Sequence, residues 1–181
     1  MINFTKVVLK GERIYLKIPA LKDATAIFNF VKNPRLTKSV QFPSPKKIEE
    51  TKKFIQQIRR KAKKEKSASF CVYLNNDTLI GSCGIGRIDW KNKAGEIGYW
   101  CGITHQKNGY TKEACLLLFH YGFKKLKLNR IEIHCIKSNL PSAKVAESLG
   151  MKKEGLLRSY RIVKGKMQDI LVYSFIKSEW R

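Results

Sequence analysis

A short turn between two apolar segments carries the residue types of an anion-binding site. Residues 105–114 read HQKNGYTKEA, and Gly109 stands where a strand-like run gives way to a helix-like run. A helix that begins there leaves backbone N–H groups unpaired near the positive end of its dipole. Glycine lets phosphate oxygens approach the backbone, while Lys107, Lys112 and the Thr111 hydroxyl add charge and a donor. The turn predicts phosphate binding, although a plain turn before a helix has the same single glycine.

Hydrophobic periodicity predicts the elements that position this turn. Strands are expected at 13–18, 68–74, 78–88, 94–103 and 130–138, with a last hairpin over 156–177 around Lys164-Gly165. Helices are expected at 19–33, 45–66, 111–126 and 141–150, and Pro34 should end the first of them. This order predicts one α+β domain over residues 1–181, with a central, mostly antiparallel sheet flanked by helices.

Charge is the most unusual property of the composition. The chain has 37 Lys and Arg against 14 Asp and Glu, a formal net charge of +23, which favours anionic partners and disfavours polycations. The helix expected at 45–66 is the densest basic segment, and its apolar stripe can dock while the cations face outward. A solvated helix face and an RNA-binding surface both fit this pattern.

Cysteines and hydropathy bear on metal binding and location. The five cysteines lie in apolar runs without metal-ligand spacing, so we expect buried, reduced thiols and no metal site. No apolar stretch is long enough to span a bilayer, and the first residues do not form a signal peptide. We therefore expect a cytoplasmic protein without membrane contact, either a monomer or a homodimer.

Three motifs in this order resemble the GNAT acetyltransferases, and within them the RimJ/RimL type that acetylates protein amino termini, especially of ribosomal proteins. They are EIGYW at 96–100, the turn at 105–114, and LNRIEIHCIKSNLPSAKVAESLGMKKEG at 128–155. The resemblance covers nearly the whole chain. It implies a GNAT (acyl-CoA N-acyltransferase) fold with the sheet splayed at the cofactor site. It also implies direct transfer of acetyl from acetyl-CoA to a primary amine.

The resemblance assigns a set of residues to the cofactor. The family's pyrophosphate signature falls on Gln106, Lys107, Asn108, Gly109, Tyr110 and Thr111, and its Asn-x-x-Ser pair falls on Asn139 and Ser142. The pantetheine arm would run beside Trp100, Cys101, Gly102 and Ile103, with a backbone N–H near Cys101 polarising the thioester carbonyl. Two positions depart from the family pattern, because Lys107 and Thr111 stand where small residues are common. We expect phosphate binding to survive, since a threonine at a helix start still offers its N–H.

Acetyl transfer needs a neutral amine and an acid for the departing thiolate. Glu96 is the expected base, because it shares a strand face with Gly98 and Trp100 and has Gly95 and Gly98 to leave room for substrate. An apolar groove around Glu96 would favour this role, whereas pairing with a nearby cation would make the glutamate structural; an ordered water is a third possibility. Ser142 is expected to protonate the thiolate or hold the cofactor, and the alternative is a helix-start hydroxyl.

The acceptor is the least determined part of the prediction. The chain is expected to acetylate a protein N-terminal α-amine, and Tyr160, Asp169 and His134 are candidates for contact with that acceptor. A polyamine or aminoglycoside acetyltransferase is one alternative. A basic ribosome- or RNA-associated module without catalysis is the other, with helix 45–66 as its contact surface.

Overall fold

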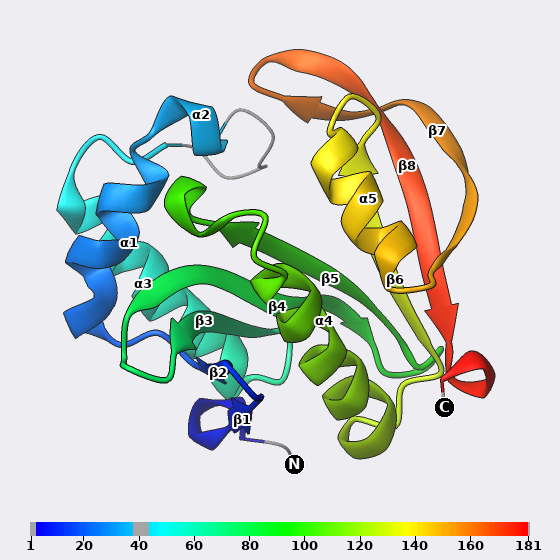
Figure 1. Ribbon diagram of the computed structural model, residues 1–181, viewed down its shortest axis with the longest axis horizontal. Coiled ribbons are helices and arrows are strands. Elements are labelled where there is room, and N and C mark those ends of the chain that lie inside the picture. Colours follow the sequence, from blue (N-terminus) through cyan, green and yellow to red (C-terminus); the bar gives the residue numbers. More distant parts are fainter. Residues whose placement is uncertain (1–2, 38–43, 181) are drawn as a thin grey trace.

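A mixed eight-stranded sheet in the order β1-β2-β3-β4-β5-β6-β8-β7 lies at the centre of the protein (Figure 1). The computed structural model describes residues 3–37 and 44–180. Neighbouring strands are antiparallel except for β5 and β6, so the predicted mostly antiparallel sheet is confirmed. The strands are β1 (Val8–Lys10), β2 (Ile14–Lys17), β3 (Ala68–Leu74), β4 (Leu79–Asp89), β5 (Ala94–Cys101), β6 (Arg130–Ile136), β7 (Lys152–Val163) and β8 (Lys166–Ile176).

Helices cover both faces of this sheet. They are α1 (Ala24–Val31), α2 (Pro34–Thr37), α3 (Ile48–Lys63), α4 (Tyr110–His120) and α5 (Leu140–Ser148). In Figure 1, α4 and α5 lie on the near face, while α1 and α3 lie on the other side. Alternate residues of β3 divide between the two layers: Phe70 and Val72 join the core under α4, whereas Cys71 and Tyr73 pack with α1 and α3.

The observed elements differ from the predicted ones mainly at their ends. Pro34 does not simply end a helix but begins α2, because proline fits the first helical turn, where no N–H is needed. The helix expected to run to residue 126 becomes a π-helical segment at Tyr121–Lys125. Strand β7 starts at Lys152, four residues before the predicted hairpin, and β1 was not predicted.

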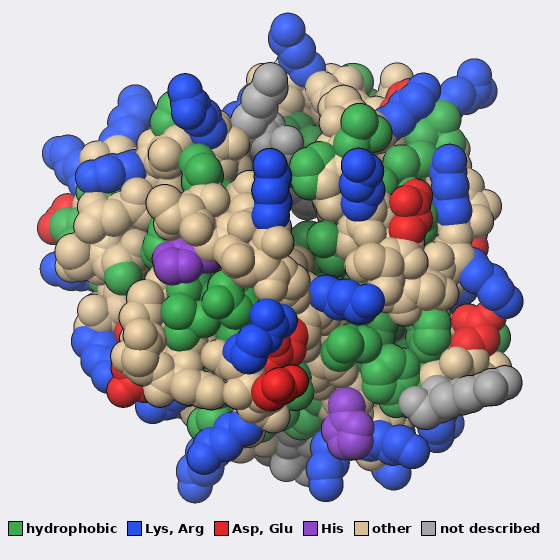
Figure 2. All heavy atoms as spheres, viewed as in Figure 1, with side chains coloured by type: hydrophobic (Ala, Val, Ile, Leu, Met, Phe, Trp, Pro, Cys, Tyr) green, Lys and Arg blue, Asp and Glu red, His purple; other side chains and the backbone are tan. Residues whose placement is uncertain are grey.

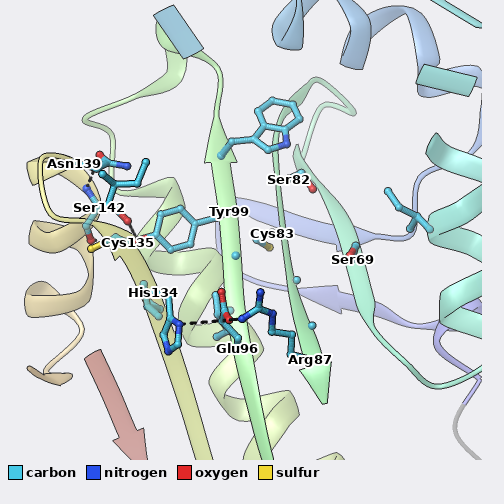
Figure 3. Close-up of a pocket in the computed structure, with 18 of the residues that line it drawn as sticks. Ser69, Ser82, Cys83, Arg87, Glu96, Tyr99, His134, Cys135, Asn139 and Ser142 are labelled. Atoms are coloured by element: carbon cyan, nitrogen blue, oxygen red, sulfur yellow. Dashed lines mark hydrogen bonds and ion pairs between the residues drawn. The ribbon is translucent and has the colours of Figure 1, made fainter. Parts of the chain in front are cut away.

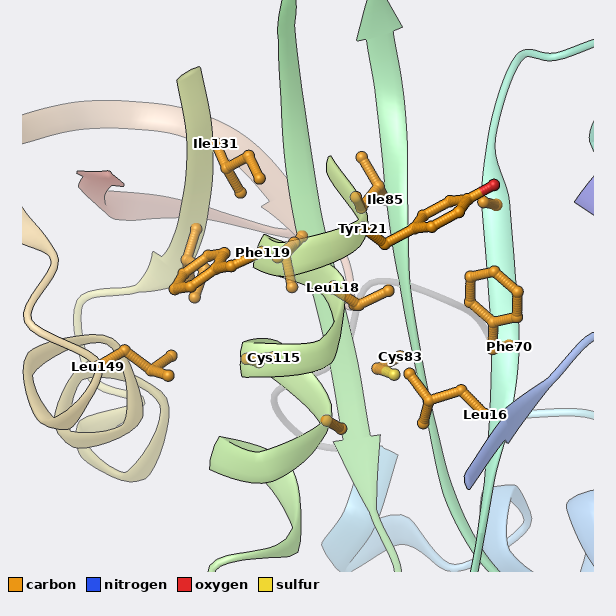
Figure 4. Packing of buried hydrophobic residues seen from close by; sticks show 14 of the residues in the cluster. Leu16, Phe70, Cys83, Ile85, Cys115, Leu118, Phe119, Tyr121, Ile131 and Leu149 are labelled. Carbon is orange, nitrogen blue, oxygen red and sulfur yellow. The ribbon is translucent and has the colours of Figure 1, made fainter. Parts of the chain in front are cut away.

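The largest core joins α4 to the strands beneath it (Figure 4). Cys115, Leu118 and Phe119 of α4 are fully buried against strand residues such as Ile85 and Ile131. Burial of this apolar face fixes α4 on the sheet. The N-terminus of α4 is thereby held beside the end of β5.

Strands β5 and β6 pair over a short length and then separate. Their parallel register runs only from Ala94 opposite Arg130 to Glu96 opposite Glu132, although β5 continues to Cys101 and β6 to Ile136. Beyond Glu96 the two strands leave an opening in the sheet. This opening is the splay expected from the family resemblance.

Candidate active site

A cavity of about 380 Å³ occupies the opening between β5 and β6 (Figure 3). Its lining comes from five elements of the sheet and helices: α3, β3, β4, β5 and β6, together with the start of α5. Five predicted site residues line it, namely Glu96, Trp100, His134, Asn139 and Ser142. The structure therefore brings together residues that are up to 46 positions apart in the chain.

Glu96 lies among cations rather than in an apolar groove. Its carboxylate is 3.1 Å from Arg87 Nη1 and 3.9 Å from Arg161 Nη1, and its side chain is 16% exposed. Figure 3 shows Arg87 and His134 approaching Glu96 from opposite sides. The expectation of an apolar groove is wrong, because two β-bulges turn these arginines toward the carboxylate: Arg87 lies at the register shift in β4, and Arg161 follows the one in β7.

His134 connects the pocket to a second carboxylate. Its Nδ1 is 3.7 Å from Glu96, and its Nε2 is 2.8 Å from Glu132. Glu132 also accepts a 2.6 Å hydrogen bond from Arg130, which is itself paired with Glu154. The His134 side chain is only 10% exposed, so it is an internal part of the site.

The two glycines beside Glu96 have different surroundings. A Cβ added to Gly98 would meet nothing within 4 Å, so this position gives open space in the pocket. A Cβ on Gly95 would lie 2.8 Å from Ile85 and 3.2 Å from Leu128. Gly95 therefore permits close packing in the core, and the expectation that it leaves room for substrate is wrong.

Tyr99 reaches across the opening to the start of α5. Its hydroxyl lies 2.9 Å from Ser142 Oγ, and burial raises the pKa of Tyr99 well above its usual range. The phenol therefore keeps its proton in neutral and alkaline solution. Asn139 caps α5, because its side-chain oxygen accepts a hydrogen bond from the Ser142 N–H. The cap leaves the side-chain NH2 of Asn139 as a donor at the pocket.

The turn before α4 has the geometry of an anion cradle. Gly109 adopts φ +80°, and the first helical hydrogen bond of α4 runs from Glu113 N–H to Gly109 O. Four N–H groups, those of residues 109–112, precede that bond, and no side chain caps them. Lys107 adopts φ +65°, a left-handed conformation within the same turn.

Side chains around this turn hold its shape. Gln106 donates to the Cys101 carbonyl at 3.0 Å, and the Asn108 side chain donates to the Gln106 carbonyl at 3.0 Å. Arg13, which sequence reasoning missed, donates to the Asn108 carbonyl at 3.0 Å and pairs with Glu113 at 2.8 Å. These bonds fix the backbone of the turn and leave the N–H groups of residues 109–112 available.

The last residues of β5 present a free backbone edge. Gly102 N–H donates to Ile80 O at 2.8 Å, on the β4 side. Because N–H groups alternate along an antiparallel strand, those of Tyr99 and Cys101 point toward the opening. Burial raises the pKa of the Cys101 thiol, and a hydrogen bond with Thr111 opposes that shift. The Thr111 hydroxyl is therefore engaged by Cys101, and Thr111 contributes its N–H to the turn.

Two of the predicted acceptor-contact residues lie away from the cavity. Tyr160 is 48% exposed on β7, and Asp169 accepts a hydrogen bond from the Ser159 N–H and pairs with Lys137. Neither is among the described residues that line the pocket, whereas His134 is. The residues missed at this end are Arg87, Arg161, Glu132 and the hydroxyl of Tyr99.

Residues 3–37 and 44–180, the part of the chain that the structure describes, hold neither a cluster of metal ligands nor a membrane-spanning helix. Within these ranges, no three His, Cys, Asp or Glu side chains gather closely enough to hold a metal ion. No helix in the same ranges has the length and apolar character needed to cross a bilayer. All five cysteines are free thiols, and Cys101 is the partly exposed one.

Comparison with known proteins defines the family. The acetyltransferase (GNAT) domain model matches residues 13–152. The uncharacterized N-acetyltransferase p20 of Bacillus licheniformis is 35% identical over 173 residues, which are 95% of this chain and 97% of that protein. The chain therefore belongs to the GNAT acetyltransferase family. The predicted GNAT fold and acetyl-CoA-dependent N-acetyltransferase activity are confirmed at the level of this family.

Two further relatives bear on cofactor and acceptor. A solved structure of the microcin C7 self immunity acetyltransferase MccE in complex with acetyl-CoA and AMP superposes with a TM-score of 0.85 at 26% identity, over 92% of this chain and 93% of that one. The ribosomal-protein-serine acetyltransferase of Escherichia coli strain K12 is 32% identical over 109 residues, 60% of this chain and 61% of that protein.

Proposed function

We propose that this protein, acting as one acetyltransferase domain over residues 1–181, acetylates the N-terminal α-amine of a protein such as a ribosomal protein. The observation that carries the proposal is the opening between β5 and β6. It has a helix-start anion cradle at one end and the paired Glu96 and His134 at the other. A cofactor that spans the opening would present its thioester to an amine held near Glu96.

Acetyl-CoA binds mainly through backbone groups in this proposal. Its pyrophosphate accepts hydrogen bonds from the N–H groups of the turn Lys107–Thr111, near the positive end of α4. Its pantetheine arm lies beside Trp100–Ile103 like an added strand, and the Asn139 amide donates to it. The Cys101 N–H, which points into the opening, polarises the thioester carbonyl.

The reaction divides between the two sides of the opening. Glu96 supports deprotonation of the acceptor ammonium, and Gly98 gives the acceptor room to approach. The amine attacks the carbonyl carbon, the C–S bond breaks, and the thiolate takes a proton from Ser142, which recovers one from the acylated nitrogen. Tyr99, at 2.9 Å from Ser142 Oγ, supports that step as a protonated phenol.

Charge favours a peptide acceptor over a polycation. Lys and Arg side chains are spread over the face shown in Figure 2, and α3 directs Lys52, Lys53 and Lys61 to solvent. This field repels spermidine and aminoglycosides and attracts acceptors that carry acidic residues or lie near RNA. The name of the Escherichia coli relative, a ribosomal-protein-serine acetyltransferase, agrees with a peptide acceptor.

An acceptor screen tests the proposal. Peptides that begin with alanine or serine, spermidine and an aminoglycoside are supplied at equal concentration with acetyl-CoA, and thiol release is followed. The peptides are expected to react fastest, and added salt should reduce the advantage of acidic peptides, because the Debye length is only ~10 Å at 0.1 M. A faster reaction with spermidine contradicts the proposal and favours a small-molecule acetyltransferase. Absence of thiol release with any amine favours a non-catalytic module.

A further inference from the structure

The amine's proton needs an acceptor, and the pocket offers one that makes no hydrogen bond. Among the described residues, His134 Nδ1 is a buried side-chain nitrogen without a hydrogen bond, in a side chain that is 10% exposed. Both carboxylate oxygens of Glu96 already face arginines, at 3.1 Å and 3.9 Å. The imidazole nitrogen is therefore the hydrogen-bond acceptor at this end of the opening that has no donor.

The other side of the ring determines which nitrogen carries the hydrogen. Glu132 lies 2.8 Å from His134 Nε2 and accepts a hydrogen bond from Arg130. A carboxylate can only accept, so Nε2 donates to Glu132, and the neutral ring keeps a lone pair on Nδ1. A carboxylate behind a histidine also stabilises the imidazolium that forms when the ring takes a proton.

We infer that His134, oriented by Glu132, is the catalytic residue that takes the proton of the acceptor ammonium, while Glu96 binds that ammonium. The inference rests on the proposed function and adds a residue role to it. The 3.7 Å between Nδ1 and Glu96 places two acceptors side by side, so one ammonium can donate to both. Glu132 is a positioning residue, because it acts on the amine through His134.

The protons of the reaction balance under this assignment. An ammonium carries three hydrogens: one passes to His134 Nδ1, one replaces the proton that Ser142 gives to the thiolate, and one remains on the amide. The nitrogen lone pair freed by the first transfer forms the new C–N bond. The imidazolium then loses its proton to solvent.

The charged groups around His134 come from several strands. Glu96 faces it from β5, and Glu132 faces it from its own strand. Arg161 from β7 and Arg87 from β4 act through Glu96, while Val172 is the residue paired with His134 on β8. Two carboxylates therefore flank the ring directly.

The test compares three variants in the reaction with whichever amine the wild type acetylates fastest. His134→Asn is expected to lower kcat by roughly 10²- to 10⁴-fold, the usual contribution of a general base, with acetyl-CoA binding unchanged. Glu132→Gln should lower kcat less and leave the KM for the amine in place. Because the lost charge disfavours the imidazolium, it should also move the acid limb of the kcat profile to lower pH. His120→Ala, which removes an exposed imidazole on α4, should change nothing.

The inference requires both the loss of kcat in His134→Asn and the shift of the acid limb in Glu132→Gln. Full activity of His134→Asn at neutral pH, or an acid limb that Glu132→Gln leaves in place, overturns the inference. The proposed function is tested separately, with the wild-type protein alone. It fails if the amine that the wild type acetylates fastest is not an α-amine. Calorimetry with acetyl-CoA confirms that each variant is folded.

Discussion

The two ends of the opening between β5 and β6 use different kinds of chemical groups. The proposed cofactor end is one continuous turn, residues 106–111, whose candidate binding groups are backbone N–H donors. The acceptor end is a set of side chains from four strands: Arg87 on β4, Glu96 on β5, His134 on β6 and Arg161 on β7. One end therefore depends on local conformation, and the other depends on how distant strands are aligned.

This difference predicts different responses to substitution. At the turn, a change matters if it alters φ or places charge against the phosphates, and the identity of nearby side chains matters less. At the acceptor end, each side chain has its own role, while the cofactor site remains intact. Variants at the two ends should thus separate acetyl-CoA affinity from turnover.

Apart from the His134 variant, Glu96→Gln gives the largest expected effect on turnover. The amide keeps the size of the side chain but loses the charge that holds the ammonium, so turnover should fall by roughly 10²-fold or more. Acetyl-CoA affinity, measured by calorimetry, should not change. The deficit should shrink in alkaline buffer, because the amine then loses its own proton. Glu49→Gln, an exposed site on α3, is the control. Full activity of Glu96→Gln at neutral pH would remove Glu96 from the mechanism.

Gly109→Asp should show the opposite pattern. Aspartate at φ +80° puts a carboxylate at the start of α4, so acetyl-CoA affinity should fall by well over the tenfold that ~1.4 kcal/mol represents. Turnover at saturating cofactor should be largely kept. Gly165→Asp is the matched control, because Gly165 has φ +77° in the β7–β8 turn, remote from the cofactor. Equal affinity of the two variants would reject the phosphate cradle.

Tyr99→Phe should have an intermediate effect. It removes the hydroxyl that bonds to Ser142, and one hydrogen bond corresponds to about 3- to 10-fold in kcat. Since burial raises the pKa of Tyr99 far above neutrality, this deficit should be the same in neutral and alkaline buffer. A Tyr99→Phe deficit that disappears with rising pH would place Tyr99 on the same proton path as Glu96.

Glu154→Gln should have the smallest effect of these variants, and the effect is on folding stability. Its Arg130 and Ser174 partners lower the pKa of Glu154 from 4.5 to about 2, so the folded state favours the charged form. The stabilisation is present above about pH 4.5 and is lost as pH falls toward 2. Because the side chain is 41% exposed, we expect about 1 kcal/mol or less. Urea unfolding of the wild type and of Glu154→Gln should show that their difference in free energy of unfolding narrows in acid. A difference that stays constant contradicts the stabilising role of the charged Glu154.

The sequence predicts the turn and helix start at the proposed cofactor end because that information is local. The residues of 106–111 are adjacent, and Gly109 marks the turn whatever the rest of the chain does. The positive φ of Gly109 and the helix start follow from residue type and order, whereas the positive φ of Lys107 does not. The predicted hairpin of 68–88 is confirmed as β3 and β4 for the same reason.

The acceptor end was only partly predictable, because bulges break the alternation on which sequence reasoning depends. Arg87 lies in the left-handed region, and so does Ser159, two residues before Arg161, so both arginines turn away from the faces that regular strands would give them. Glu132 and His134 share a strand face as alternation requires. Their approach to Glu96 depends on the parallel register of β5 and β6, which no local pattern records.

One peptide tests the central claim most directly. It begins with serine and carries a single lysine farther along, so its α-amine and its lysine amine compete at equal concentration. An α-amine has a pKa roughly 2 to 3 units below that of lysine, and therefore offers more neutral nucleophile. After reaction with acetyl-CoA at neutral pH, fragment masses locate the acetyl group. The account predicts acetylation at the α-nitrogen; acetylation at the lysine, or a peptide left unmodified, would contradict it.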